Sequence, residues 1–205
     1  MIVFHGWATP NSRRVSIMLE ELGLAYHAHG VNIREREQFA PEILALNPYG
    51  KVPILEIDDL VLFESGAILL HLAETRGRFL PKQAAARTSV LAWFMVAMTS
   101  LGPFTGQAHH WTELAPEKPE AARAHTVGLV ARVYELLDGR LAKNRHLAGE
   151  DYSIADIAAW PWIEKHGWAE MRLEQYPHLA RWFAEVGARP AVQRGMQMPA
   201  GAKLE

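Results

Sequence analysis

The chain has 205 residues, of which 49% are hydrophobic and 21% charged, and its formal net charge is −2. This composition is that of an average soluble globular protein, and a chain of this length buries roughly 70% of its unfolded surface. The charge argues against nucleic acid as a main partner, and the longest apolar runs, such as Val90 to Met98, are about half of what a membrane-spanning helix needs.

The first part of the chain alternates between strand and helix patterns. Strand patterns occur at residues 2–5 and 25–33 and on both sides of Asp58 and Asp59, and helix patterns occur at residues 9–24, 41–48 and 66–74. Residues 1–77 are therefore predicted to form a compact α/β domain with a small mixed sheet.

After a linker at residues 77–83 the strand patterns stop. Residues 84–111 are apolar and aromatic-rich, and an apolar stripe at helical spacing runs through residues 118–143. Ser153, followed three residues later by Asp156, is a capping-box pattern that predicts the start of a further helix. Pro177 and Pro190 stand at a favoured helix-start position. Residues 84–205 are therefore predicted to form an all-helical domain.

The chain contains no cysteine. It can form no disulfide, offers no thiolate ligand to zinc and has no thiol nucleophile, so any sulfur chemistry must come from a ligand. Because His109 and His110 are adjacent on a predicted helix and point about 100° apart, they fit one metal ion poorly, and no metal is expected. The N-terminus lacks the pattern of a secretory signal, so we expect a cytoplasmic protein.

Three short segments have residue types that suit a zwitterionic thiol peptide. Pro53 cannot donate to a sheet ladder, so the segment NPYGKVPIL at residues 47–55 presents either an ordinary edge loop or a peptide edge for strand addition. Ser65 is either a plain N-cap or, with Glu64, a site for a carboxylate and an ammonium group. Thr9, Asn11 and Ser12 either cap a helix or lower the pKa of a bound thiol.

Taken together, these segments resemble the cytosolic glutathione transferases over the whole chain. NPYGKVP, FESGAILLHLAE and YSIADIAAWPW are similar to motifs of that family in order and spacing. TPN at residues 9–11 and GPFTGQAHHW at residues 102–111 resemble the nu class, which is associated with glutathione-dependent disulfide reduction. The resemblance implies a thioredoxin-like N-terminal domain, an all-helical C-terminal domain and a homodimer.

The resemblance also implies a role for individual residues. Val52 would pair its backbone with the cysteinyl unit of glutathione, ahead of a cis Pro53. Glu64 and Ser65 would hold the γ-glutamyl group, and Lys51 would lie near a carboxylate. Gln38 and Arg132 would also contact the ligand, with Arg132 reaching it, or a second glutathione, from the helical domain.

The loop after the first strand departs from many members of the family, because residue 7 is Trp, residue 8 is Ala and no cysteine is present. The TPN pattern therefore favours Thr9 and Asn11 as the catalytic pair, each a hydrogen-bond donor to the thiolate, with Ser12 as an alternative. This predicts a disulfide reductase that uses glutathione as co-substrate and acts on a small disulfide. The alternatives are a conventional transferase that conjugates electrophiles and a glutathione-binding regulatory module without turnover.

Overall fold

The computed structural model describes residues 1–203, which divide into two compact units. The first unit contains residues 1–78 and the segment from Ala188 onward, and the second contains Phe79–Gly187. Each unit has its own buried core and is described separately.

The first unit is built on a four-stranded mixed sheet with the strand order β2-β1-β3-β4. The strands are β1 (Ile2–Gly6), β2 (His27–Gly30), β3 (Ile54–Ile57) and β4 (Leu60–Phe63). β1 pairs in parallel with β2 and antiparallel with β3, and β3 pairs antiparallel with β4. The predicted thioredoxin-like fold of the N-terminal part is confirmed.

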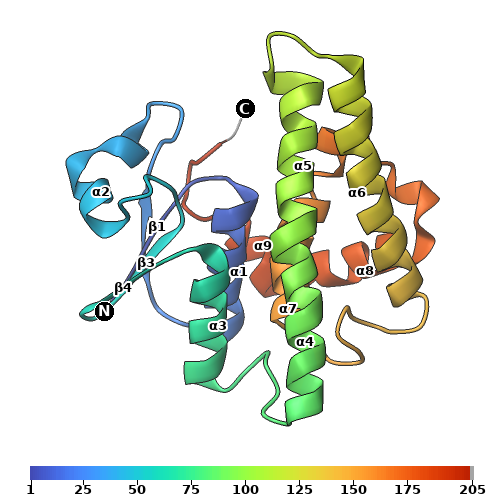
Figure 1. The fold of residues 1–205 in the computed structure, drawn as a ribbon. Helices are drawn as coiled ribbons and strands as arrows, with labels where there is room; N and C mark the ends of the chain where they lie inside the picture. The colour runs from blue at the N-terminus through green and yellow to red at the C-terminus, as the bar shows by residue number, and fades with distance from the viewer. Residues whose placement is uncertain (204–205) are drawn as a thin grey trace. The chain divides into compact units, whose positions relative to one another are not determined.

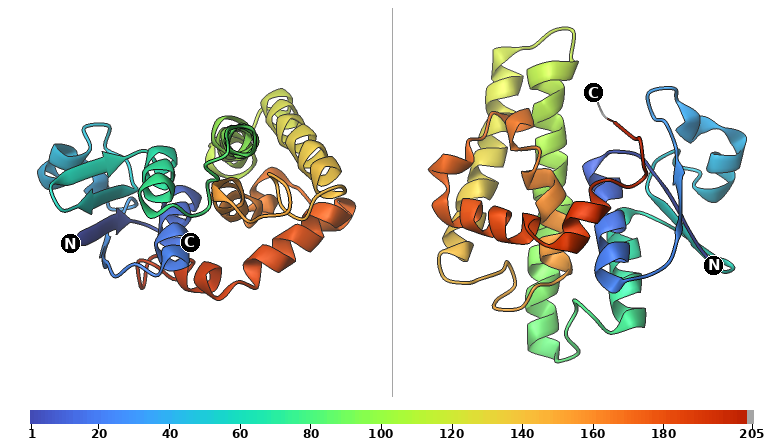
Figure 2. Two further views of the ribbon diagram at one scale, coloured as in Figure 1. Left: turned by 90° about the horizontal axis from the view of Figure 1, so that it is seen from below. Right: turned by 180° about the vertical axis from the view of Figure 1, so that it is seen from behind.

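Helices cover both faces of this sheet (Figures 1 and 2). α1 (Pro10–Leu22) and α3 (Ser65–Arg76) lie on one face, and α2 (Pro41–Leu46) lies on the other with the short 3-10 helix η1 (Glu37–Phe39) before it. α1 begins at its N-cap Thr9 and ends at Gly23, whose φ of 65° is the left-handed conformation that glycine adopts readily.

The last helix, α9 (Pro190–Gly195), belongs to the first unit and packs on α1. The sequence analysis placed it in the helical domain. The difference arises from tertiary contacts: Ser16 donates to the carbonyl of Gly195 at 2.7 Å, and Arg189 and Arg194 pair with glutamates of α1 at 2.6 and 2.7 Å. A Cβ at Gly195 would lie 2.6 Å from the backbone of Ile17, so only glycine permits this approach.

The second unit is all-helical, as predicted. Its first helix is continuous from Ala84 to Leu114 and includes α4 (Ala84–Val96), the π-helical turn η2 (Ala97–Leu101), α5 (Gly102–His109) and a second π turn, η3 (His110–Leu114). It is followed by α6 (Glu120–Leu141), α7 (Ile154–Ile163), the 3-10 turns η4 (His166–Ala169) and η5 (Leu173–Gln175), and α8 (Pro177–Gly187). α6 packs beside α5 (Figure 1).

The helix Ala84–Leu114 is longer and more apolar than the sequence patterns indicated. Its most apolar window has a mean hydropathy of 1.3, and only 22% of that window is buried. By length and composition alone it could cross a membrane, and among residues 1–203 it is the one helix that passes this test. The predicted stretch ended at residue 111, and the second π turn, η3, carries the helix on to Leu114.

A buried carboxylate organises the core of the second unit. Asp156 is fully buried, and Oδ1 accepts hydrogen bonds from the Leu147 N–H at 3.0 Å and the Trp182 indole N–H at 2.8 Å. Oδ2 accepts from the N–H and hydroxyl of Ser153, which completes the predicted capping box of α7. Burial raises the pKa of Asp156, and these donors oppose the rise. One side chain thus joins α7, α8 and the loop before α7.

We expect Asp156→Ala to lower the free energy of unfolding by about 3 kcal/mol, because several buried donors lose their acceptor. Urea unfolding measures this as a lower midpoint with an unchanged slope. The matched control is the exposed Asp151→Ala, which should change stability by less than about 0.5 kcal/mol. Equal stability of the two variants would show that Asp156 does not organise this core.

Candidate functional site

The register of the sheet brings four connecting segments to one end of the first unit. Gly6 at the end of β1 pairs with Gly30 at the end of β2. Ile54 at the start of β3 pairs with His5 on one side and with Phe63, at the end of β4, on the other. The segments that follow β1, β2 and β4 and the segment that precedes β3 therefore leave the sheet at the same edge. They contain every sequence-predicted site residue of this unit.

The first of these segments carries Thr9 and Asn11 into the first turn of α1. The Thr9 hydroxyl accepts a hydrogen bond from the Ser12 N–H at 3.2 Å, which is the N-cap interaction. Asn11 is half-buried, and its Oδ1 accepts a hydrogen bond from Arg14 at 2.9 Å. Both side chains thus lie at the positive end of a 13-residue helix, where partial charge favours an anion.

Ser12, the alternative to Thr9 and Asn11, has no access to a ligand. Its side chain is 0% exposed, and its Oγ accepts hydrogen bonds from the Trp7 N–H at 3.2 Å and from the Thr9 hydroxyl at 3.0 Å. The structure therefore gives Ser12 a supporting position beneath Thr9.

The second segment is the turn before β3, which Asn47 holds together. Its Nδ2 donates to the Lys51 carbonyl at 2.7 Å, and its Oδ1 accepts from the Tyr49 N–H at 3.0 Å. Gly50 has a φ of 64°, and a Cβ there would lie 2.8 Å from the ring of Phe39, so the turn requires glycine. The ammonium group of Lys51 lies 4.0 Å from the ring centroid of Tyr49.

This turn leaves unpaired backbone groups just before β3. The Val52-Pro53 peptide bond is cis, as the resemblance implied, and β3 begins at the next residue. Within residues 1–203, the N–H and C=O groups of Val52 take part in none of the turn or ladder hydrogen bonds. An extended peptide can add to such groups as a further strand.

The third segment is the turn from β4 into α3. The sequence analysis assigned the N-cap of this helix to Ser65, whereas the structure places the cap at Glu64 and makes Ser65 the first helical residue. The reason is the backbone of Glu64, whose φ of 67° turns the chain directly from strand to helix. Glu64 makes no side-chain cap hydrogen bond, so the first N–H groups of α3 receive no side-chain cap. Such a helix start attracts a carboxylate.

Arg14 joins the first and third segments, and the sequence analysis missed it. The side chain is 2% exposed, and its Nη1 donates to Asn11 Oδ1 at 2.9 Å and to Ser65 Oγ at 3.2 Å. Burial lowers the pKa of Arg14 to about 9, and the charge of Glu64 opposes this. The available signal was the helical spacing, which puts Arg14 on the same face as Asn11 and the buried Met18.

The two remaining predicted residues lie in different units. Gln38 belongs to η1 in the first unit, and its side-chain oxygen is buried without a hydrogen-bond partner among residues 1–203. Arg132 lies on α6 of the second unit and is exposed. Its contact with a ligand in the first unit remains a prediction.

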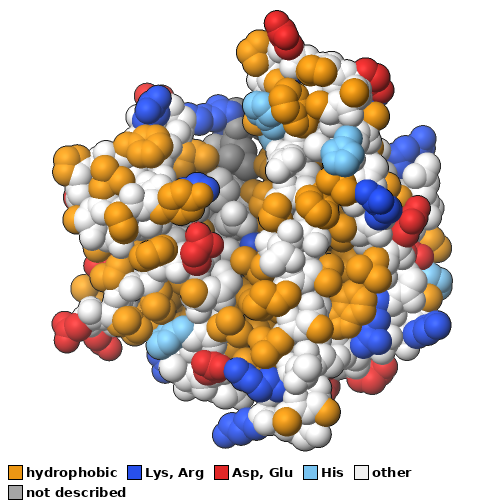
Figure 3. All heavy atoms as spheres, viewed as in Figure 1, with side chains coloured by type: hydrophobic (Ala, Val, Ile, Leu, Met, Phe, Trp, Pro, Cys, Tyr) orange, Lys and Arg blue, Asp and Glu red, His pale blue; other side chains and the backbone are white. Residues whose placement is uncertain are grey.

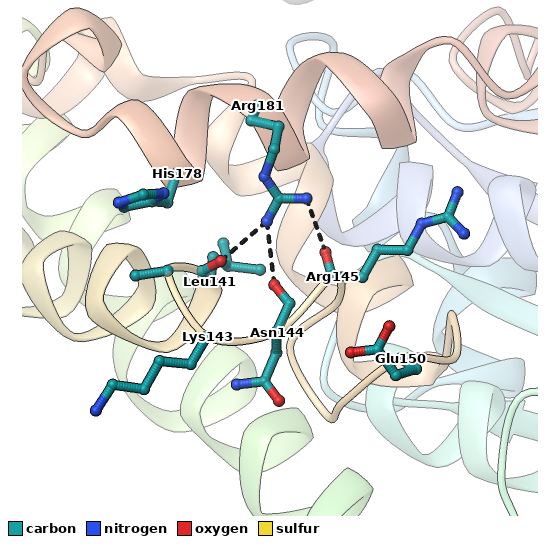
Figure 4. Close-up of a pocket in the computed structure, with 8 residues that line it drawn as sticks. Leu141, Lys143, Asn144, Arg145, Glu150, His178 and Arg181 are labelled. Carbon is teal, nitrogen blue, oxygen red and sulfur yellow. Dashed lines mark hydrogen bonds between the residues drawn. The ribbon is translucent and has the colours of Figure 1, made fainter.

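The second unit has a polar pocket of about 300 Å³ at the end of α6 (Figure 4). Arg181 from α8 points into it and donates to the carbonyls of Leu141, Asn144 and Arg145 at 2.9, 3.0 and 3.5 Å. These hydrogen bonds cap the end of α6, so Arg181 has a structural role there.

The structure gives the adjacent histidines separate surroundings. His109 stacks on Trp168 at 4.0 Å and pairs with Glu113, while His110 packs edge-on against Trp111. Burial lowers the pKa of His109. Within residues 1–203, no three His, Cys, Asp or Glu side chains form a group that could hold a metal ion.

Two family models match the chain. The glutathione S-transferase N-terminal domain matches residues 1–74, and the glutathione S-transferase C-terminal domain matches residues 68–190. The chain belongs to the glutathione transferase family. The resemblance seen in the sequence motifs is thereby confirmed, and the edge of the sheet described above lies within the N-terminal transferase domain.

Individual relatives of this transferase cover nearly its whole length. The disulfide-bond oxidoreductase YfcG of Escherichia coli is 37% identical over 206 residues, which are 96% of this chain and 94% of that protein. A glutathione transferase of Burkholderia graminis was solved with two glutathione molecules per subunit. It matches this chain with a TM-score of 0.91 and 35% identity, and the match covers 98% of this chain and 89% of the Burkholderia chain. A glutathione transferase of Pseudomonas putida, solved with one glutathione disulfide per subunit, has a TM-score of 0.90 and 35% identity over 97% of this chain and 91% of its own.

We expect Asn47→Ala to lower the free energy of unfolding by about 2 kcal/mol, because the turn before Val52 loses two hydrogen bonds around a buried side chain. Denaturant unfolding measures the change. Asn32→Ala is the matched control, since Asn32 forms a similar local bond to the Arg34 N–H in an exposed loop. If both variants were as stable as the wild type, Asn47 would not be what holds this turn.

Proposed function

We propose that this glutathione transferase is a glutathione-dependent disulfide reductase in which every reacting sulfur belongs to a ligand. The observation that carries the proposal is the meeting, at one end of the sheet, of two helix starts and a residue with unpaired backbone groups: Thr9 with Asn11, Glu64 with Ser65, and Val52. The cysteine-free sequence supports it, because the chain supplies no thiol of its own.

Glutathione fits these groups end to end. In the proposal, the start of α3 and the Ser65 hydroxyl receive the γ-glutamyl carboxylate, and the exposed carboxylate of Glu64 receives the ammonium group. The cysteinyl unit pairs with the backbone N–H and C=O of Val52 ahead of Pro53. Lys51 lies beside this edge and is assigned to the glycyl carboxylate.

Gln38 and Arg132 complete the proposed binding residues. The buried side-chain oxygen of Gln38 has no partner among residues 1–203, which suits a donor group of the ligand. We assign Arg132, from the second unit, to a carboxylate of the same or of a second glutathione. Support for a second molecule comes from the Burkholderia graminis transferase, which was solved with two glutathiones per subunit.

The chemistry requires a thiolate, and the start of α1 favours one. A hydrogen bond to a charged sulfur from the Asn11 amide, or from the Thr9 hydroxyl once it turns from Ser12 Oγ to the ligand, lowers the pKa of the glutathione thiol together with the helix dipole. The thiolate attacks one sulfur of a disulfide RSSR, forming a mixed disulfide and releasing RS⁻, which takes up a proton. A second glutathione thiolate attacks the glutathione sulfur of that intermediate, giving glutathione disulfide and the second thiol. Two electrons pass from two glutathiones to RSSR.

Two alternatives use the same binding site. A conventional transferase would direct the thiolate at an electrophilic carbon, and a regulatory module would bind glutathione without turnover. We favour disulfide reduction because the TPN loop has donors but no tyrosine or cysteine at residues 7 and 8, and because the 37%-identical relative is named a disulfide-bond oxidoreductase. The proposal places the protein in the cytoplasm, where thiol pools are kept reduced.

The deciding experiment compares turnover on a small symmetrical disulfide with turnover on an aryl halide, each with glutathione. Disulfide reduction well above conjugation is expected. The reverse ratio would identify a conventional transferase, and glutathione binding without either activity would identify a binding module.

We expect Asn11→Ala to reduce kcat for the disulfide about tenfold or more, with glutathione affinity changed less than about threefold, because Asn11 contacts the thiolate and not the peptide ends. Steady-state kinetics and calorimetric titration separate the two effects. The matched control is Asn32→Ala, an asparagine in an exposed loop of the same unit. Wild-type turnover in Asn11→Ala would remove Asn11 from the mechanism.

We also propose that the protein is a homodimer. Only 22% of the apolar window of the helix Ala84–Leu114 is buried, and Met95 of α4 and Leu136 of α6 are 44% and 49% exposed. Between these helices lies a pocket of about 460 Å³ lined by Trp93 and Leu136, and Figure 3 shows hydrophobic side chains gathered over the same face. An exposed apolar patch of this kind is typical of a protein interface.

Sedimentation measured over a range of concentrations tests the dimer. We expect a species of about twice the chain mass, with dissociation on dilution, because burial of apolar surface drives association and depends on concentration. A 23.0 kDa species at every concentration would contradict the proposal.

A further inference from the structure

We propose that Arg14 is a positioning residue that sets the direction of the hydrogen-bond donors at both ends of the glutathione site. It fixes Asn11 so that amide hydrogens face the thiolate, and it fixes Ser65 so that the hydroxyl hydrogen faces the γ-glutamyl carboxylate. This inference rests on the proposed function of the site.

The geometry places one nitrogen atom between the two side chains. Nη1 of Arg14 lies 2.9 Å from Asn11 Oδ1 and 3.2 Å from Ser65 Oγ, and α1 and α3, which carry these residues, pack against each other. Nη1 has two hydrogens, and each hydrogen serves one partner. A single buried guanidinium therefore joins the start of α1 to the start of α3.

An arginine can only donate hydrogen bonds, so each partner must present an acceptor to it. Asn11 then turns its carbonyl oxygen toward Arg14, and the NH₂ group of the amide occupies the other side of the side chain. Without Arg14 the amide could rotate by about 180°, and its oxygen lone pairs would face the thiolate and repel it. Arg14 thus decides whether Asn11 stabilises or destabilises the anion.

The same reasoning applies to Ser65. A hydroxyl group has one hydrogen and two lone pairs, and the bond from Arg14 uses a lone pair of Oγ. The hydroxyl hydrogen remains for a second partner, which makes Ser65 a donor to a carboxylate. Without Arg14, nothing would hold the Ser65 hydroxyl hydrogen toward the γ-glutamyl carboxylate.

The neighbouring arginine on α1 has a different role. Arg13 is also buried, but its Nη1 donates to the carbonyls of Gly195 and Met198, so it anchors the segment after α9. Arg13 and Arg14 are both buried arginines of α1, and they differ in the groups that they contact. Arg13 is therefore a matched control for Arg14.

The experiment compares Arg14→Met and Arg14→Lys with the wild type and with Arg13→Lys. Calorimetry gives the affinity for glutathione, the ultraviolet absorbance of the thiolate gives the pKa of the bound thiol as a function of pH, and thermal unfolding checks the fold. Methionine keeps much of the volume and removes every donor. Lysine keeps the charge but is one bond shorter, so its ammonium group cannot reach both partners.

For Arg14→Met we expect the pKa of the bound thiol to rise by about one pH unit and glutathione to bind about tenfold more weakly. Arg14→Lys should move both quantities in the same direction by a smaller amount. Arg13→Lys should lower the unfolding temperature and leave the thiol pKa unchanged. A purely structural role for Arg14 would give the Arg13 pattern and would overturn the proposal.

Double mutants test whether Arg14 acts through its two partners. In an Asn11→Ala background, Arg14→Met should raise the thiol pKa no further, and in a Ser65→Ala background it should weaken glutathione binding by much less than tenfold. Full, additive effects in both backgrounds would overturn the positioning role. Should Arg14→Met fail to fold, the same cycles with Arg14→Lys decide the question.

The proposed function and this inference fail in different ways. If the wild-type protein bound no glutathione, the proposed site itself would be wrong. If the wild type bound glutathione with a lowered thiol pKa, and a folded Arg14→Lys variant had the same affinity and the same pKa, only the role of Arg14 would be wrong.

Discussion

The central position of β1 in the sheet is the constraint on which the candidate site depends. Because β1 pairs in parallel with β2 and antiparallel with β3, the loops after β1, β2 and β4 and the turn before β3 all leave at the same edge. Residues far apart in the sequence, from Thr9 to Ser65, then become neighbours at one end of a rigid sheet. A site built this way needs no long loop, since short turns at strand ends present the backbone groups and helix starts to the ligand.

Each unit also contains a buried ionisable side chain whose hydrogen bonds join separate elements. In the second unit, Asp156 collects donors from α7, α8 and the preceding loop, and it completes the capping box with Ser153. In the first unit, Arg14 donates hydrogen bonds to Asn11 and Ser65. A buried charge is expensive unless such partners surround it, so each of these groups fixes the geometry of its neighbours. Asp156 thereby shapes a core, and Arg14 lies at the edge where the function is proposed.

The absence of cysteine and the hydrogen-bond donors at the helix starts fit a reaction in which the ligand supplies the sulfur. A protein that lacks a thiol can still act on disulfides if it binds a thiol peptide and favours its ionised form. The protein then contributes binding, orientation and hydrogen-bond donors, and the ligand contributes the sulfur. Membership of the glutathione transferase family fits this division of roles, because the family models cover the sheet that carries the donors as well as the helical unit.

Local sequence patterns were enough to predict the two-part architecture, the capping box at Ser153, and the candidate segments around Thr9, Val52 and Ser65, because each pattern is a spacing within a few residues. It could not assign α9 to the first unit, since the contact of Gly195 with Ile17 is a long-range approach that no local pattern encodes. It placed the cap of α3 at Ser65, because the backbone turn of Glu64 is set by how β4 meets the helix. Only the tertiary structure buried Ser12 and connected Arg14 to both Asn11 and Ser65, because burial and pairing depend on which helices pack together.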